Sequence, residues 1–377
     1  MDINLSLFFR RTISLSFWAY HGNLERELAL FEHLQERGVK IDFYTYGGLD
    51  DLAFRKKLSG IRIFCNQWGF SDKLYEFLLP FLHGKSLRQT TIIRSNQIDG
   101  ADIALRAARF WRKPFIARGG YIYSFNTAQK FGSNSSKVRQ AERLERKVFS
   151  GAEQIIVTTP IMKEHLSEKY HLSPGKFQVI PNYVNTSVFQ PDTNLERIPR
   201  SLCYIGRLNP EKNVLNIIEA VKDLGVRLTM IGQGPLRSQV LSMKEKYSLD
   251  MEVMDFLPNK ELPAYINRSE IYIQPSQYEG HPKTILEAMA CAAPVIGANT
   301  VGTRELISHG ENGWLCEPTV EGIRTAVLCL LKDEALRKKL GKNARQTILE
   351  NYALEKVVEM ELALYRELLE ENKTSQA

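Results

Sequence analysis

The chain has 377 residues, of which 44 % are hydrophobic and 25 % are charged, and its net charge is +7. This composition is that of a folded protein and not of a disordered chain, and the length predicts two domains. Its five cysteines are odd in number and scattered, which argues against a disulfide framework and predicts free thiols in a reducing cytoplasm. No apolar run reaches the roughly twenty residues of a spanning helix, and Arg10 and Arg11 split the N-terminal apolar stretch, so we predict no secretion signal and a cytoplasmic location.

Strands and helices alternate along the first half. The expected strands lie at residues 12–17, 39–44, 61–65, 91–94, 114–117 and 154–158, and the expected helices lie at residues 24–36, ended by Gly38, and 101–111. The same alternation of strands and helices begins again at Ser201. Residues 354–369 carry apolar residues at helical spacing. This alternation predicts an α/β fold with two parallel sheets, each covered by helices on both faces.

The charge is divided unevenly between the two halves. Residues 1–190 contain 27 Lys and Arg against 17 Asp and Glu, a net +10, whereas residues 191–377 contain 23 against 26, a net −3. The two domains are therefore expected to have different partners, with an anionic one for the first. No nucleic-acid-binding motif accompanies the basic half, so we do not expect RNA or DNA.

Residues 70–83, FSDKLYEFLLPFLH, are rich in Leu and Phe and are followed by Lys85 and Arg88. Such a segment could lie on an anionic membrane surface with its cations at the headgroups. A buried helix kinked at Pro80 explains the same residues equally well.

The most informative stretch is residues 271–294, IYIQPSQYEGHPKTILEAMACAAP. An apolar strand at 271–273 is followed by a turn that contains Glu279 and by a helix at 284–289 that contains Glu287. In open α/β sheets this order places a helix N-terminus over a ligand at the carboxyl ends of the strands. Acids that accept hydrogen bonds from hydroxyls, beside amides that donate to phosphate, suit a sugar nucleotide.

The spacing Glu279-x7-Glu287, together with its flanks EG-P---LEAMA-----P, resembles the donor-site motif of the GT-B glycosyltransferases of family 4. The resemblance is specific over roughly residues 150–350 and only topological before them. Four further segments resemble landmarks of that family in the same order, namely residues 179–185, 203–213, 226–234 and 301–315.

The resemblance implies a GT-B fold, with two Rossmann-like β/α/β domains facing a central cleft. Residues 1–183 would form the acceptor-binding domain, residues 184–353 the domain that binds the nucleotide-sugar donor, and residues 354–377 a helix crossing back to the first domain. The implied activity is transfer, with retention of configuration, of a hexosyl group from a UDP- or GDP-sugar to a glycan or lipid-linked saccharide. The setting would be cell-surface polysaccharide or glycolipid biosynthesis, at the inner face of the cell membrane if the protein is peripheral.

Arg207 and Lys212 follow an apolar strand at residues 202–205. Two fixed cations beside a diphosphate stabilise the charge that develops as the glycosidic bond breaks, and so raise the rate. By resemblance these two residues and Glu279 are the catalytic ones, with Glu279 contacting the transferred sugar and Glu287 the ribose hydroxyls. The resemblance assigns further donor contacts to Gly206, Gly280, His281, Pro282, Lys283 and Thr284.

The first half departs from the family pattern at two places. Only Gly22 stands in the turn where a pair of glycines usually meets the donor phosphates, and Arg118 stands where many members have a histidine. Arg118 could contact an anionic sugar or acceptor, or it could only support its loop.

No metal or cofactor is predicted. Asp50 and Asp51 do not form the Asp-x-Asp of metal-dependent glycosyltransferases and are interpreted as a solvated turn, and the seven histidines have no zinc-binding spacing. The segment from Gly232 to Arg237 lacks the last glycine of a dinucleotide-binding loop.

Two other kinds of protein remain open. One is a sugar phosphorylase or hydrolysing epimerase of the same fold, and the other is a catalytically idle GT-B protein that serves as a membrane or partner scaffold. The sequence specifies neither the donor base and sugar, nor the acceptor and linkage, nor the oligomeric state.

Overall fold

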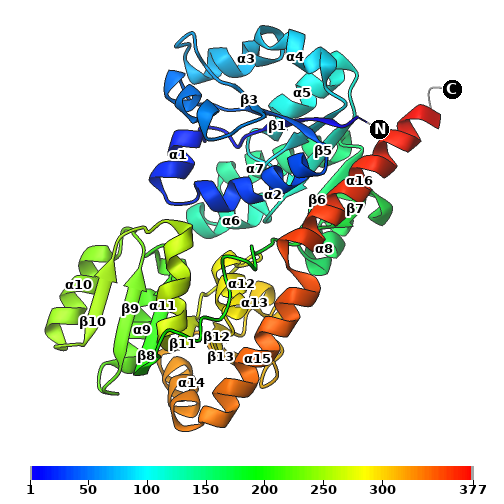
Figure 1. Cartoon of the computed structure of the whole chain (residues 1–377). Coiled ribbons are helices and arrows are strands. Elements are labelled where there is room, and N and C mark those ends of the chain that lie inside the picture. Colours follow the sequence, from blue (N-terminus) through cyan, green and yellow to red (C-terminus); the bar gives the residue numbers. More distant parts are fainter. Residues whose placement is uncertain (1, 375–377) are drawn as a thin grey trace. The chain divides into compact units, whose positions relative to one another are not determined.

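The structure is a computed structural model that describes residues 2–374. By its internal contacts the chain forms two compact units, each built on one sheet (Figure 1). The first unit contains the residues up to Pro181 together with those from Val357 onward, and the second runs from Asn182 to Lys356.

The first unit has a seven-stranded sheet in the order β3-β2-β1-β4-β5-β6-β7, with all neighbours parallel. Its strands are β1 (Asn4–Phe8), β2 (Lys40–Tyr44), β3 (Ile61–Phe64), β4 (Ile92–Ser95), β5 (Phe115–Gly119), β6 (Gln154–Val157) and β7 (Phe177–Val179). The order reverses between β1 and β4, so the chain builds outward from the centre in both directions, as in a doubly wound fold.

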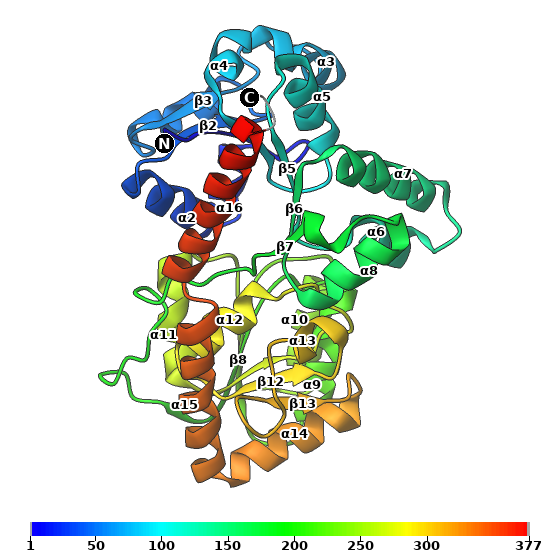
Figure 2. The same cartoon turned by 90° about the vertical axis from the view of Figure 1, so that its right-hand side faces the viewer.

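Helices cover both faces of this sheet (Figure 2). They are α1 (Leu15–Tyr20), α2 (Leu24–Glu36), α3 (Asp72–Leu82), α4 (Gly84–Gln89), α5 (Ala101–Trp111), α6 (Tyr123–Phe131), α7 (Ser136–Gly151), α8 (Pro160–Tyr170) and the terminal α16 (Leu354–Thr374), with short 3-10 helices at Leu49–Lys56 and Pro174–Lys176.

The predicted first strand at residues 12–17 is wrong, because the sheet begins earlier with β1 and the chain is helical from Leu15. Ser14 accounts for the helix, since its Oγ accepts a hydrogen bond from the Phe17 amide at 3.0 Å and caps the N-terminus of α1. The alternating apolar residues of this segment had the period of a strand, but a serine at the cap position favours a helix.

The predicted solvated turn at Asp50 and Asp51 is wrong for Asp51, which is completely buried. Its carboxylate accepts hydrogen bonds from the amide and hydroxyl of Ser16, at 3.0 and 3.2 Å, and from the Thr45 hydroxyl at 2.5 Å. Asp51 therefore ties the start of α1 to the end of β2.

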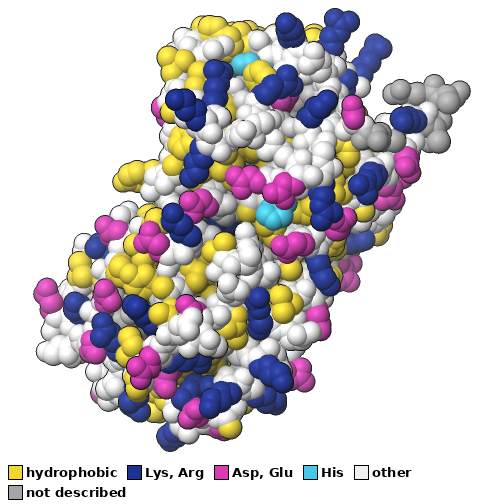
Figure 3. Space-filling view, viewed as in Figure 1, with side chains coloured by type: hydrophobic (Ala, Val, Ile, Leu, Met, Phe, Trp, Pro, Cys, Tyr) yellow, Lys and Arg dark blue, Asp and Glu magenta, His cyan; other side chains and the backbone are white. Residues whose placement is uncertain are grey.

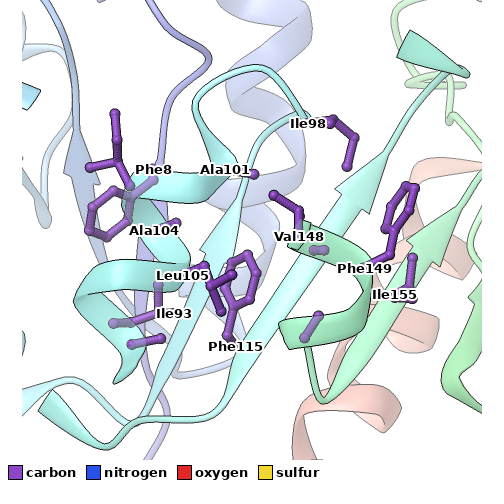
Figure 4. Close-up of a cluster of buried hydrophobic side chains, with 14 of the residues drawn as sticks. Phe8, Ile93, Ile98, Ala101, Ala104, Leu105, Phe115, Val148, Phe149 and Ile155 are labelled. Atoms are coloured by element: carbon purple, nitrogen blue, oxygen red, sulfur yellow. The ribbon is translucent and has the colours of Figure 1, made fainter. Parts of the chain in front are cut away.

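One core of the first unit lies between the sheet and helices α5 and α7 (Figure 4). Strand residues such as Phe8, Ile93 and Phe115 meet the small side chains of α5, among them Ala101 and Ala104, which let the helix lie close to the sheet. This helix has the bounds predicted for residues 101–111.

Helix α16 is attached to the first sheet through a buried ion pair. A guanidinium nitrogen of Arg94, on β4, donates to Glu361 at 2.6 Å, and both side chains are buried. The Tyr365 hydroxyl donates to the other oxygen of Glu361 at 2.6 Å.

The second unit has a six-stranded parallel sheet in the order β10-β9-β8-β11-β12-β13. Its strands are β8 (Ile198–Ile205), β9 (Arg227–Ile231), β10 (Met251–Met254), β11 (Ser269–Gln274), β12 (Val295–Ala298) and β13 (Trp314–Cys316). Its helices are α9 (Val214–Val221), α10 (Arg237–Lys246), α11 (Leu262–Arg268), α12 (Lys283–Ala290), α13 (Val301–Arg304), α14 (Val320–Lys332) and α15 (Glu334–Asn351), with 3-10 turns at Pro210–Lys212 and Asn259–Glu261.

All five cysteines are free thiols. None of the helices within residues 2–374 combines the length and the apolar character that crossing a membrane requires. Two parallel α/β sheets, each with helices on both faces, are the architecture that the sequence predicted.

Candidate functional site

The predicted site of the second unit lies where its strand order reverses. The chain builds from β8 to β10 on one side and from β11 to β13 on the other, so the switch point falls between β8 and β11. In open α/β sheets, ligands bind outside the carboxyl ends of the strands at this point. The loop after β8 carries Arg207 and Lys212, and the loop after β11 carries Glu279.

Lys212 and Glu279 meet directly across the switch point. Their Nζ and Oε1 atoms are 2.5 Å apart, and both side chains are largely buried. Two further hydrogen bonds join the loops, since the Gln277 amide donates to the Glu211 carbonyl at 2.9 Å and the Asn213 side chain donates to the Pro275 carbonyl at 3.1 Å. Asn213 has a φ of +61°, a conformation that asparagine tolerates better than most residues.

Gln274 extends this pair into a hydrogen-bonded chain. Its Nε2 donates to Glu279 Oε1 at 2.8 Å, and its Oε1 accepts from the hydroxyls of Thr284, at 2.5 Å, and Tyr272, at 3.0 Å. Glu279 is thus oriented by a cation on one side and by an amide on the other. Gln274 was not among the predicted site residues, although it is the last residue of β11 and lies shortly before the acid motif.

Arg207 differs from Lys212 in being 65 % exposed. Its guanidinium lies 3.7 Å from Glu211, and its carbonyl accepts from the Tyr204 hydroxyl at 2.8 Å. Burial, and then the nearby carboxylate of Glu279, raise the pKa of Tyr204 well above its usual value, so the phenol remains a donor. The backbone of Arg207 is therefore fixed while its charged end can reach a ligand.

Two glycines of the turn after β9 pack against the Arg207 loop. A Cβ on Gly232 would lie 2.0 Å from the Gly206 carbonyl oxygen, and one on Gly234 would lie 2.4 Å from the Leu208 carbonyl oxygen. The Leu208 amide donates to the Gln233 carbonyl at 2.9 Å. This close approach explains the Gly-Gln-Gly sequence, which is not a dinucleotide-binding loop.

Glu287 is buried on the second turn of α12. The side-chain amide of Asn259, which follows β10, donates to its Oε1 at 3.1 Å. The acid is therefore oriented from a third loop at the same edge of the sheet. Asn259, like Gln274, was not among the predicted site residues.

The turn before α12 is fixed from two directions. The Asn182 side chain donates to the His281 carbonyl at 2.7 Å, and the His281 ring lies 5.4 Å from the ring of Tyr352. On the other side, Gly302 lies so close that a Cβ there would be 2.3 Å from the carbonyl oxygens of Glu279 and Gly280. These contacts set the position of Pro282, the N-cap residue of α12.

Lys283 and Thr284 begin α12, as the motif predicted. The Lys283 ammonium lies 5.9 Å from the centre of the Tyr183 ring, and Thr284 is hydrogen-bonded to Gln274. The amides of this first helical turn, together with the positive end of the helix dipole, form a place for an anion beside Lys212 and Glu279.

The other two predicted residues belong to the first unit. Arg118 lies near the end of β5, where its amide donates to the Ser95 hydroxyl at 3.1 Å. Gly22 has a φ of +67° and follows helix α1, not the first strand as expected, because β1 ends at Phe8. Their functional roles stay predictions.

Within residues 2–374, no group of three or more His, Cys, Asp or Glu side chains is arranged to hold a metal ion. The predicted site of the second unit combines two cations, Arg207 and Lys212, two oriented carboxylates, Glu279 and Glu287, and the N-terminus of α12. This set can bind a diphosphate at the cations and the helix, and hydroxyls at the carboxylates.

Two units, each with a parallel sheet covered by helices, have the architecture of the GT-B class. Two family models match the chain over adjoining segments, "Glycosyltransferase Family 4" over residues 28–188 and "Glycosyl transferases group 1" over residues 189–347. The chain belongs to the family 4 glycosyltransferases.

Individual relatives are distant. N-acetyl-alpha-D-glucosaminyl L-malate synthase of Bacillus anthracis is 26 % identical over 238 residues, which are 59 % of this chain and 62 % of that protein. UDP-Gal:alpha-D-GlcNAc-diphosphoundecaprenol alpha-1,3-galactosyltransferase of Escherichia coli is 27 % identical over 228 residues, or 55 % of this chain and 58 % of that protein. The matched region thus spans less than two thirds of the length of each.

Solved structures share the fold over almost the whole length of this chain. The structure of HepE from Anabaena, in complex with UDP and glucose, superimposes with a TM-score of 0.77 at 16 % identity. The match covers 96 % of this chain and 99 % of HepE.

Proposed function

We propose that this protein is a retaining glycosyltransferase that moves a sugar from a nucleotide-diphosphate sugar, UDP- or GDP-linked, to a glycan or lipid-linked saccharide. The second unit binds the donor, and the first, which carries Arg118, serves the acceptor side. Gly22 of the first unit remains a predicted donor contact. The observation that carries the proposal is the Lys212–Glu279 pair at the switch point, beside Arg207 and the N-terminus of α12.

Each group of the site has a part in this reaction. Arg207 and Lys212 neutralise the diphosphate as it leaves, which stabilises the transition state more than the bound donor. Glu279 accepts hydrogen bonds from hydroxyls of the transferred sugar, and Glu287 accepts them from the ribose. The amides at the start of α12 donate to phosphate oxygens.

The reaction proceeds on one face of the sugar. The acceptor oxygen bonds to the anomeric carbon from the side on which the diphosphate departs, and the acceptor proton passes to the leaving phosphate oxygen. The bond to the phosphate breaks as the new glycosidic bond forms, so charge and atoms balance without a protein nucleophile. Water has to be kept from the anomeric carbon, as in other group-transfer enzymes.

The relatives support a UDP-sugar as the first donor to test, because HepE was solved with UDP and the Escherichia coli relative is named for UDP-Gal. That relative is also named for a diphosphoundecaprenol acceptor, which supports a lipid-linked acceptor here. The proposed role is in cell-surface polysaccharide or glycolipid biosynthesis, and the proposed location is the cytoplasm. We propose that transfer requires neither a metal ion nor a cofactor. Full loss of transfer in EDTA, restored by magnesium or manganese, would contradict the metal-independent part.

Thermal stabilisation by UDP, GDP and ADP tests donor binding. A nucleotide at one hundred times its Kd adds about 2.7 kcal/mol to the free energy of unfolding and raises Tm measurably. Arg207→Ala should keep the Tm of the ligand-free protein, because its side chain is mostly exposed, and should lose most of the shift. Arg227→Ala, an exposed arginine at the other end of a strand in the same sheet, should keep the shift.

Slow hydrolysis of the donor distinguishes an active enzyme from an idle scaffold. Release of free sugar from the stabilising nucleotide sugar, lost in Arg207→Ala and kept in Arg227→Ala, supports transfer. Stabilisation without any hydrolysis, with every acceptor class inactive, would favour the scaffold.

A further inference from the structure

Helix α3 has apolar side chains on two opposite faces. Tyr75 and Leu79 are buried against the first unit, whereas Leu74, Phe77 and Phe81 are 44, 60 and 50 % exposed. These three positions follow one another at i, i+3 and i+7, so they form one outward stripe along the helix. A helix that is apolar all round normally buries its second face as well.

Phe110 on helix α5 continues this stripe. It is 54 % exposed, and its ring meets that of Phe81 edge to face with the centroids 4.9 Å apart. We call Leu74, Phe77, Phe81 and Phe110 the α3–α5 apolar stripe. Scattered exposed apolar residues need no explanation, but four that adjoin on two packed helices indicate a binding surface.

The stripe is held rigidly. Pro80 has no amide hydrogen, so the Glu76 carbonyl one turn earlier lacks its helical donor. Arg106 on α5 donates to that carbonyl and, at 3.2 Å, to the Phe77 carbonyl, while the Trp111 indole donates to the Pro80 carbonyl at 2.9 Å. Helix α5 therefore supports α3 through hydrogen bonds on both sides of Pro80.

Cations lie on the same helices as the stripe and on the neighbouring helix α4. Six exposed ones lie on helices α3 to α5 and the residue that ends α5, namely Lys73, Lys85, Arg88, Arg106, Arg109 and Arg112. Asp72 is the one exposed acid among residues 72–112, all of which the structure describes. Figure 3 shows Lys and Arg side chains gathered over this end of the first unit, close to hydrophobic ones.

Two of these six cations, Arg109 and Arg112, line a cavity beside the C-terminal end of α5. The cavity has a volume of about 540 Å³, and its lining includes four cations and two acids. One acid, Glu153, already accepts a hydrogen bond from the Phe115 amide at 2.7 Å. The four cations are Arg109, Arg112, Lys113 and Lys373.

We propose that the α3–α5 surface docks the protein on an anionic phospholipid membrane. The apolar stripe enters the boundary between headgroups and acyl chains, the six cations meet lipid phosphates, and the cavity accepts one headgroup phosphate. A second copy of the chain fits this surface poorly, since a two-fold contact would set the same cations against each other. The proposal goes beyond glycosyl transfer and concerns only where the protein resides.

Flotation with vesicles tests it. The full chain should float with vesicles of phosphatidylcholine mixed with phosphatidylglycerol, and much less with phosphatidylcholine alone. Arg109→Gln with Arg112→Gln should weaken binding about tenfold or more, because each surface cation contributes about fivefold. Phe77→Ser with Phe81→Ser should weaken it at least about tenfold through lost apolar insertion.

Matched controls lie on the same unit. Arg139→Gln with Arg143→Gln on α7 removes the same charge from exposed positions, and Phe131→Ser removes an aromatic ring that is 43 % exposed. Both should bind vesicles as the unchanged protein does. All variants should retain their Tm and their nucleotide-induced shift, so a failure of membrane docking can be told from a failure of the proposed donor site.

Three results would overturn the docking proposal. The first is no flotation with anionic vesicles at low salt, and the second is an equal loss in the α7 control, which would mean unspecific charge attraction. The third is a concentration-dependent dimer that Phe77→Ser with Phe81→Ser dissolves, which would assign the stripe to a second copy.

Discussion

The Nζ atom of Lys212 lies 2.5 Å from Oε1 of Glu279, although the two residues are separated by 66 others and follow different strands. The pair joins the loops that follow β8 and β11, the two strands at which the sheet order reverses. In the proposed reaction the two side chains serve different parts of one donor, the lysine its diphosphate and the carboxylate its sugar. The ion pair therefore sets the distance between those two contacts before the donor arrives.

Lys212→Ala should lower kcat by roughly 10²–10³, the scale for loss of one group that stabilises developing charge. KM for the donor should rise less, because the contact is stronger in the transition state than in the bound donor. Steady-state kinetics with the stabilising nucleotide sugar measure both.

Lys244→Ala is the control for that variant, since it removes a lysine from α10 in the same unit. A loss in KM alone for Lys212→Ala, with kcat unchanged, would contradict a transition-state role. An equal loss in the control would point to an unspecific effect of charge.

Glu287→Ala should weaken UDP binding by about 10–100-fold, the range for a lost hydrogen bond to a charged group. Asn259→Ala, which removes the donor to Glu287 Oε1, should weaken it less, because the carboxylate itself remains. Isothermal titration with UDP and with a 2′,3′-dideoxy analogue separates the ribose contact from the rest. If Glu287→Ala loses affinity equally for both ligands, the acid does not contact the ribose.

Much of this site could be predicted because its motif is local. Glu279, Thr284 and Glu287 lie within one strand–turn–helix, where spacing alone puts an acid on the turn and another on the helix. Gln274 and Asn259 could not be predicted in the same way. Their roles depend on which strands are neighbours in the sheet and on which side chains those strands bring together.

In the fold, too, local sequence patterns predicted some features, whereas others depend on contacts between distant residues. Helix α5 was predicted with its observed bounds because its apolar residues repeat at helical spacing. In the structure it is flanked by two residues in the left-handed conformation, Gly100 and Arg112. The first strand was placed too late, since β1 is a short strand buried between two neighbours and its apolar residues lack a distinctive pattern. Asp51 was misplaced at the surface because its three hydrogen bonds come from residues that the fold brings together.

Gly302→Ala should impair the donor site without removing any polar group. The new methyl carbon would fall 2.3 Å from the carbonyl oxygens of Glu279 and Gly280, so the acid loop or helix α13 has to shift. We expect a fall in Tm and a loss of nucleotide affinity. Gly175→Ala is the control, because the nearest atom to its new carbon would be 3.7 Å away, and it should change neither quantity. Unchanged nucleotide affinity in Gly302→Ala would show that the loop tolerates the shift.

The free energy of unfolding should fall in mild acid, because His83 is a buried histidine that resists protonation in the folded protein. This residue is buried among aromatic rings, its Nε2 lies 3.0 Å from the Tyr75 hydroxyl, and burial lowers its pKa to about 4. The unfolded chain, with a histidine pKa of about 6.5, binds a proton over the interval in which the folded protein does not. The free energy of unfolding therefore rises with pH from about 4 to about 6.5, by about 3 kcal/mol from this residue.

Urea unfolding at a series of pH values measures this contribution as the difference between the unchanged protein and His83→Gln. Carboxylates that titrate in the same range contribute equally to both proteins and cancel in the difference. The variant should be less stable near neutral pH, because a buried ring is lost, and its stability should fall less steeply between pH values of about 6.5 and 4. His165→Gln, at an exposed position, should keep the steep dependence. A parallel pH dependence for His83→Gln and the unchanged protein would mean that His83 gains its proton without unfolding the chain.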